Sequence, residues 1–189
     1  PLYNPADFTP PYNPWEQRLC LVPDSDFFAA MRSGKTSIRT ATIAQVEPSG
    51  VRLADGSLLE ADLLVTATGL QLSLGGKIAV SLDGQKVNWG AEWFYRGAMI
   101  SNVPNLTFVF GYLNASWTLR VDMMGDFVCN LLNHMGELGA KRVEVALRDE
   151  DQDMEILPWI EPDNFNPGYL MRGLDQLPRR GAKSEWRHN

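Results

Sequence analysis

Residues 106–117 read Leu106-Thr107-Phe108-Val109-Phe110-Gly111-Tyr112-Leu113-Asn114-Ala115-Ser116-Trp117, a short apolar run that passes through small and polar residues into a helix. Beyond it, apolar side chains recur at helical spacing: Leu119, Met123, Phe127, Val128, Leu131, Leu132, Met135 and Leu138. The pattern predicts a helix from about Trp117 to Leu138 that ends at Gly139, with Arg120 on one of its polar faces. Asn114 or Ser116 can cap this helix, so its start is either a plain N-cap or a site for an electron-rich carbonyl or anion.

A second informative stretch lies upstream and reads Asp62-Leu63-Leu64-Val65-Thr66-Ala67-Thr68-Gly69. Continuous apolar residues predict a strand that is buried on both faces of a larger sheet. The small residues after it let another backbone or a cofactor approach closely. Taken alone, the stretch is better explained as an ordinary strand that ends in a glycine turn.

The remaining sequence predicts short elements around these two stretches. Asp24-Ser25-Asp26 before an apolar run predicts a short helix that stops at Gly34. Residues 36–70 predict a small antiparallel meander with a hairpin at Asp55-Gly56. Residues 71–105 are expected to be irregular and to pack onto the sheet through aromatic side chains, whereas residues 142–148 fit a strand or a helix equally well.

Three regions follow from these patterns. Residues 1–24 form an extended, proline-rich lead-in, residues 25–140 hold the regular elements, and residues 141–189 form a proline-rich tail that packs through its aromatic side chains. As an isolated chain the fold class is therefore α+β, with a β-meander and one long helix.

Composition excludes several functional classes. The chain has 189 residues, with 17 basic and 23 acidic side chains and a net charge of −6, which disfavours binding to nucleic acid. It lacks an apolar stretch of about 18 residues that could span a membrane, and it does not open on a signal peptide, so we expect a soluble, cytoplasmic protein. Two cysteines and two histidines offer little for a disulfide framework or a metal site.

Self-contained catalytic motifs are missing from the chain. It contains no G-x-G-x-x-G, G-x-x-x-x-G-K-[ST], G-x-S-x-G or H-E-x-x-H pattern. We therefore assign no catalytic or metal-binding residue within it.

Several stretches in a fixed order nevertheless resemble the C-terminal part of flavin-containing monooxygenases, most closely the bacterial Baeyer–Villiger and ethionamide-activating branch. The matching stretches span nearly the whole chain: residues 12–24, residues 61–70, Tyr95-Arg96-Gly97, Val103-Pro104-Asn105-Leu106, residues 111–119, and Asn166-Pro167-Gly168-Tyr169-Leu170. In the parent this resemblance implies an FAD/NAD(P)-binding, Rossmann-like α/β fold, of which residues 25–140 are the C-terminal portion of the FAD-binding domain and residues 1–24 lie at the junction with the NADP-binding domain.

The resemblance also implies roles for individual residues. Thr68 and Gly69 would lie beside the cofactors, where the chain returns from the NADP-binding domain to the FAD-binding domain. Arg18 would lie near the NADP phosphate. The remaining cofactor-binding residues that it implies would line the flavin: Gly111, Asn114, Ala115, Ser116 and Trp117.

The implied parent reaction uses FAD and NADPH. It inserts one oxygen atom from O2 into ketones, or oxidises sulfur and nitrogen nucleophiles, through a C4a-(hydro)peroxyflavin. The family's FAD and NADP fingerprints are absent here, so the chain is interpreted as a fragment that is inactive alone.

A different interpretation is a non-catalytic α+β domain that binds a peptide or protein partner. Under either interpretation the apolar strands would lack neighbours, so we expect the fragment to form a homo-oligomer that covers them.

Overall fold

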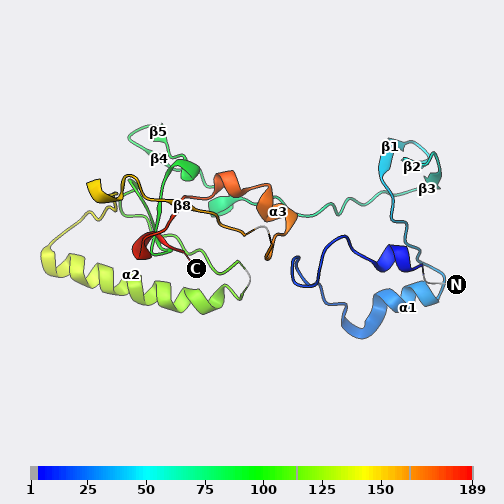
Figure 1. Ribbon diagram of the computed structural model, residues 1–189, viewed down its shortest axis with the longest axis horizontal. Coiled ribbons are helices and arrows are strands. Elements are labelled where there is room, and N and C mark those ends of the chain that lie inside the picture. Colours follow the sequence, from blue (N-terminus) through cyan, green and yellow to red (C-terminus); the bar gives the residue numbers. More distant parts are fainter. Residues whose placement is uncertain (1–3, 114, 162, 189) are drawn as a thin grey trace. The chain divides into compact units, whose positions relative to one another are not determined.

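The protein was analysed as a computed structural model, which describes residues 4–113, 115–161 and 163–188. Two compact units divide the chain, unit 1 over Pro1–Gly69 and unit 2 over Leu70–Asn189 (Figure 1). Helices and small antiparallel sheets make up both units, which confirms the predicted α+β class for the chain.

Unit 1 contains the predicted short helix and the predicted meander. Helix α1 spans Asp26–Arg32, and the sheet consists of β1 (Ile43–Glu47), β2 (Gly50–Leu53) and β3 (Leu58–Glu60) in the order β1-β2-β3. Two short 3-10 helices precede them, η1 (Pro5–Phe8) and η2 (Pro23–Ser25).

The hairpin between β2 and β3 forms where Asp55-Gly56 predicts it. Gly56 has a φ of +85°, and the Asp55 carboxylate accepts a hydrogen bond from the Ser57 N–H at 2.8 Å. Gly50 is equally constrained, because a Cβ there would lie 2.0 Å from the carbonyl oxygen of Leu59 on the neighbouring strand. Local turn chemistry therefore explains this sheet.

The predicted buried strand at residues 62–66 is wrong for this chain. These residues are extended but unpaired, and the side chains of Leu63 and Val65 are 79% and 75% exposed. A strand needs a hydrogen-bonding neighbour and a layer of side chains over each face, and no described residue supplies either.

Unit 2 is built from three two-stranded sheets and a long helix. The sheets pair β4 (Ser81–Leu82) with β5 (Gln85–Lys86), β6 (Phe94–Tyr95) with β7 (Met99–Ile100), and β8 (Ile156–Leu157) with β9 (Arg180–Gly181). Helix α2 spans Thr118–Leu138 and ends at Gly139, as predicted, and α3 spans Gly168–Met171. Five 3-10 turns complete it: η3 (Leu74–Lys77), η4 (Trp89–Ala91), η5 (Asp149–Asp151), η6 (Leu174–Gln176) and η7 (Ser184–Trp186).

The largest buried cluster of unit 2, here the aromatic core, consists of Phe94, Ile100, Val103, Phe110 and Leu177. The aromatic loop before β6 packs into this core through Trp89. The C-terminal tail joins it, because Phe94 donates to the carbonyl of Arg179 at 3.0 Å and Trp159 packs against the core.

Two further predictions for unit 2 need correction. Residues 106–110 form no strand, and only Thr107 makes an isolated bridge, to Met99. Residues 142–148 are neither strand nor helix, but their carbonyls at Val143 and Val145 accept hydrogen bonds from Asn105 and Asn102. In both segments the pairing is too short and irregular to build a ladder.

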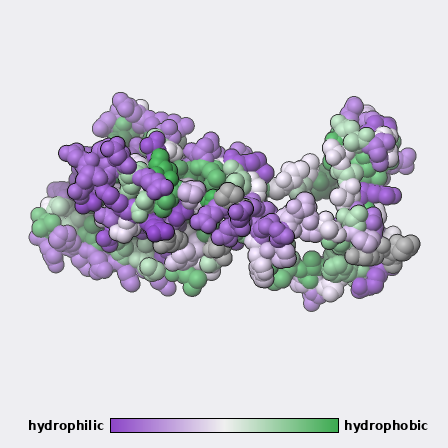
Figure 2. Space-filling view, viewed as in Figure 1, coloured by the Kyte–Doolittle hydropathy of each residue, from purple (hydrophilic) through white to green (hydrophobic). Residues whose placement is uncertain are grey.

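Helix α2 exposes part of its predicted apolar stripe. Met124, Phe127 and Leu131 face the protein, while several other apolar residues are exposed: Leu119, Val121, Met123, Leu132 and Leu138. Arg120, predicted on a polar face, is buried instead. Figure 2 shows apolar residues reaching the visible surface among polar ones.

Candidate functional site

Gly111 and Trp117 meet where the chain leaves the aromatic core and enters α2. A Cβ on Gly111 would lie 2.4 Å from Cγ of Trp117 and 2.8 Å from its Cα, so only glycine fits. The Trp117 ring lies 5.2 Å from the ring of Phe110, centroid to centroid, and its side chain stays 47% exposed. A half-exposed indole is thereby fixed at the helix start.

The start of α2 differs from the predicted cap. Trp117 stands at the N-cap position with helical φ and ψ of −61° and −33°, and it makes no capping hydrogen bond. The Ser116 hydroxyl instead lies 2.7 Å from the Thr118 hydroxyl, so the prediction that Ser116 caps the helix is wrong. An N-cap side chain reaches the N–H groups from an extended backbone, which is not formed here. The alternative cap, Asn114, lies outside the described residues.

A buried arginine and histidine lie directly beneath this helix start. Arg120 Nη1 lies 2.9 Å from each ring nitrogen of His188, and His188 Nε2 lies 3.3 Å from the carbonyl oxygen of Gly111. With its proton on Nε2, His188 accepts from Arg120 through Nδ1 and donates to Gly111. The pair thus joins the end of the chain, the first turn of α2 and the Gly111 backbone.

Electrostatics keep this histidine neutral. Burial, and then the charge of Arg120, lower the pKa of His188 to about 3. Burial also lowers the pKa of Arg120, although the nearby Tyr112 ring, 4.9 Å from its guanidinium carbon, opposes this. One positive charge is therefore held close to the positive end of the α2 dipole.

A hollow of about 200 Å³ adjoins the pair. Its lining includes Tyr112, Leu113, Trp159, Arg180 and His188. Arg180 donates to the carbonyl of Pro158 at 2.7 Å, and its guanidinium carbon lies 5.4 Å from the Trp159 ring centre. The lining also contains Glu161, whose carboxylate partly offsets the charge of Arg180. The neighbourhood of Gly111 is thus aromatic, with Arg120 buried beside it, which favours a flat ligand.

The other predicted site residues fall into two groups. Ala115 and Ser116 are exposed in unit 2, beside Trp117. Arg18, Thr68 and Gly69 are exposed in unit 1, where Gly69 has a φ of +97°. The residues predicted to line a flavin, with Asn114 excepted, therefore lie together in unit 2. Arg18, predicted near the NADP phosphate, and Thr68 and Gly69, predicted beside the cofactors at the domain junction, belong to unit 1.

Sequence reasoning missed Arg120 and His188. They are 68 residues apart, so no motif spacing connects them. The sequence contains only weak indications of this contact, because Arg120 is one charged residue in the first turn of the helix and His188 is one histidine in an aromatic-rich tail.

Metal binding and membrane insertion find no support in the described ranges. No cluster of three or more histidine, cysteine or acidic side chains in them is arranged to hold a metal ion. Nor is any helix of those ranges sufficiently long and apolar to cross a membrane.

Comparison with known proteins shows that the chain is homologous, over nearly its whole length, to a class of enzymes, the FAD-containing monooxygenases. It is 46% identical over 182 residues to FAD-containing monooxygenase EthA of Mycobacterium tuberculosis, matching 96% of this chain and 36% of that protein. It is 40% identical over 180 residues to the probable FAD-binding monooxygenase AlmA of Acinetobacter baylyi, with 95% and 35% covered.

A third relative is the putative FAD-containing monooxygenase MymA of Mycobacterium tuberculosis, 39% identical over 182 residues, with 96% of this chain and 36% of that protein covered. The chain thus spans about a third of the length of these relatives. No family model and no solved structure matches it. The resemblance to flavin-containing monooxygenases noted in the sequence is confirmed.

Proposed function

We propose that the chain is the C-terminal, flavin-facing part of an FAD- and NADPH-dependent monooxygenase with a Rossmann-like parent fold. The observation that carries this is the match, along 95–96% of the chain, to three proteins named as FAD-containing or FAD-binding monooxygenases. The same match favours this function over a free-standing binding domain, because the similarity runs through both units.

The residues around Gly111 fit the electron-rich pyrimidine end of a flavin. The first turn of α2 has no capping side chain, and the Arg120 charge lies in that same turn. The N–H groups of Leu119 and Arg120 donate to the carbonyls of Ser116 and Trp117, so the dipole and charge of the helix start, rather than free N–H groups, would act on the ring. A helix dipole at such a position stabilises negative charge by about 0.3–2 kcal/mol. Bound FAD would supply the oxygen-activating redox chemistry.

Residues of this chain would then hold and orient the ring. Gly111 lets the Trp117 indole close over the backbone, Trp117 in turn offers an exposed aromatic face, and Ser116 offers a hydroxyl beside the helix start. Asn114 and Ala115 belong to the same loop in sequence. In unit 1, Arg18 would lie near the NADPH phosphate, and Thr68 and Gly69 would lie beside the cofactors at the junction of the two nucleotide-binding domains.

The chain alone should not catalyse the oxygenation reaction. It lacks the glycine-rich turn that cradles the FAD pyrophosphate in dinucleotide-binding folds. We therefore expect residues 1–189 by themselves to consume no NADPH, and the remainder of the protein to supply the nucleotide sites.

The test is to purify the full-length protein that carries these residues. We expect a yellow flavin spectrum, and NADPH consumption that rises with a thioether or a cyclic ketone and is matched by sulfoxide or ester formation. The ratio of the two products identifies the preferred substrate class. A protein without flavin, or without substrate-stimulated NADPH consumption, would overturn the proposal.

A variant sharpens this test. Ser116→Ala in the full-length protein should shift the flavin absorption maximum and slow its reduction, whereas Ser184→Ala, a hydroxyl loss in η7 outside the Gly111 loop, should leave both unchanged. Equal effects from both variants would contradict the assignment of the Gly111 loop to the flavin.

A further inference from the structure

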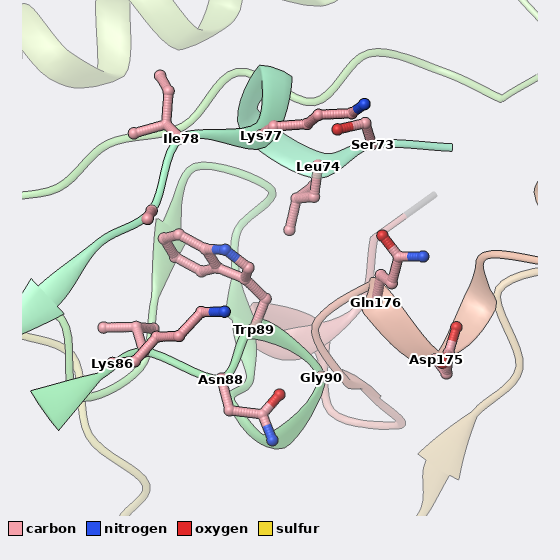
Figure 3. Close-up of a pocket in the computed structure, with 12 residues that line it drawn as sticks. Ser73, Leu74, Lys77, Ile78, Lys86, Asn88, Trp89, Gly90, Asp175 and Gln176 are labelled. Atoms are coloured by element: carbon pink, nitrogen blue, oxygen red, sulfur yellow. The ribbon is translucent and has the colours of Figure 1, made fainter. Parts of the chain in front are cut away.

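Unit 2 contains a larger hollow, of about 540 Å³, whose lining shares no residue with the hollow beside His188 (Figure 3). Three segments form it: the loop around η3, strand β5 with η4, and η6. Its volume falls within the range of about 300–1,000 Å³ that is typical of small-molecule sites.

The apolar part of the lining is held in place by the protein interior. Leu74, Val87 and Trp89 line the hollow, and all three pack against the aromatic core. Gly90 also lets η4 meet η6 closely, since a Cβ there would lie 2.2 Å from the carbonyl oxygen of Asp175. The indole of Trp89 is therefore a pre-formed surface, visible in Figure 3 with Leu74 and Lys86 on either side of it.

Two lysines supply positive charge at this hollow. Lys77 has a φ of +69° and follows Gly75 and Gly76, which also have positive φ. A positive φ is unfavourable for a residue with a side chain, so the tight loop around η3 fixes the backbone from which the Lys77 side chain extends. Lys86 lies on β5, which follows a tight turn at Asp83-Gly84 with positive φ at both positions.

Within the described part of the chain, the ammonium groups of Lys77 and Lys86 make no hydrogen bond or ion pair that would neutralise their charge. The lining contains one carboxylate, Asp175, against these two lysines. This local excess of positive charge occurs in a chain whose net charge is −6. Ser73, Asn88 and Gln176 add neutral hydrogen-bonding groups.

We propose that this hollow binds a planar aromatic ligand that carries a carboxylate or phosphate. The ring packs on the Trp89 indole, where aromatic contact adds to the gain from buried area. The anionic group pairs with Lys86, whose side chain runs beside the indole in Figure 3, while Lys77 is directed toward Ser73 and attracts the anion at longer range. Asp175 repels the anionic group from the η6 side, which sets the ligand's orientation. The site does not depend on the flavin chemistry proposed above.

The test is calorimetric titration of the 189-residue chain with 2-naphthoate as the probe. We expect saturable binding at one site, with affinity that falls as salt is added because the lysines are exposed. Lys86→Gln should weaken binding about threefold to tenfold, and Lys77→Gln should weaken it less. Inorganic phosphate alone should bind more weakly than an aryl phosphate, because it cannot use the indole.

The controls separate this site from general attraction to positive charge. Lys35→Gln removes the same charge in unit 1 and should leave the affinity unchanged. The neutral 2-naphthylmethanol should bind at least about tenfold more weakly than 2-naphthoate. Absence of saturable binding, equal affinity for the neutral alcohol, or equal weakening by Lys35→Gln would each overturn the proposal.

Discussion

Gly111 shows how one residue decides whether the candidate flavin site forms. Any side chain there would meet both the ring and the backbone of Trp117. The glycine thus allows the indole to cover the chain at the helix start, and the loop has no freedom to move away without releasing α2.

Gly111→Ala should therefore lower the free energy of unfolding by about 1–3 kcal/mol, the usual cost of overpacking. Trp117 should move, which changes its fluorescence. Thermal denaturation followed by tryptophan emission measures both effects. Gly125→Ala, where a Cβ meets nothing within 4 Å, is the matched control and should not destabilise.

His188 makes stability depend on pH in a defined direction. Its folded pKa of about 3 lies below its ordinary value of 6.5, so protonation favours the unfolded chain. Stability from this group is complete above about pH 6.5 and is lost as pH falls toward about 3. Urea midpoints measured between these limits should decline, and they should decline less in His188→Gln. An identical slope in the variant would contradict the buried neutral histidine.

Asp151 makes stability depend on pH at lower pH values than His188 does. Its side chain is fully buried, accepts from Arg148 Nε at 2.8 Å and pairs with Lys183, and the hydrogen bonds from Arg148 and then Lys183 lower its pKa from 3.8 to about 2. Its contribution is present above about pH 4 and is lost as pH falls toward about 2. Asp151→Asn should flatten the acid limb of the same urea series, and an unchanged limb would show that the carboxylate adds nothing.

At the scale of elements, α2 carries two glycines that its geometry does not need. Gly125 and Gly136 have ordinary helical backbones and open space where a Cβ would lie. Gly136→Ala should raise the free energy of unfolding by about 0.5–1 kcal/mol, because alanine loses less backbone entropy on forming a helix. Thermal melts test this, and the same change at Gly139, whose φ is +65°, should destabilise.

The same elements show what the sequence could and could not predict. Helix α2 and the meander depend on local signals, apolar spacing and the Asp55-Gly56 turn, and both form as predicted. Residues 62–66 and 106–110 need partner strands, which their own composition cannot guarantee. For the candidate site, the sequence was sufficient to identify the Gly111 loop. It could not predict the Arg120–His188 contact, because these residues are 68 positions apart and meet only through tertiary folding.

For the molecule as a whole, the exposed apolar residues of unit 1 and α2 have a consequence in solution. Leu63 and Val65 belong to an extended, unpaired segment, which is a template for pairing with a second copy. We expect the isolated chain to form a homo-oligomer whose molar mass by light scattering rises with concentration. Leu63→Glu with Val65→Glu should reduce that rise, whereas Leu21→Glu, equally apolar and exposed, should not. A monomer at all concentrations would contradict this.

The exposed segment of residues 61–70 also makes the junction of the two units a preferred site of cleavage. All of its residues are exposed and none is in a helix or strand, so a protease can bind it as an extended substrate. Brief digestion should cut after Leu63, Leu64 or Leu70 before it attacks α2 or the meander. Unit 2 would then be recovered as a resistant fragment that carries the Gly111 loop, both hollows and the Arg120–His188 pair.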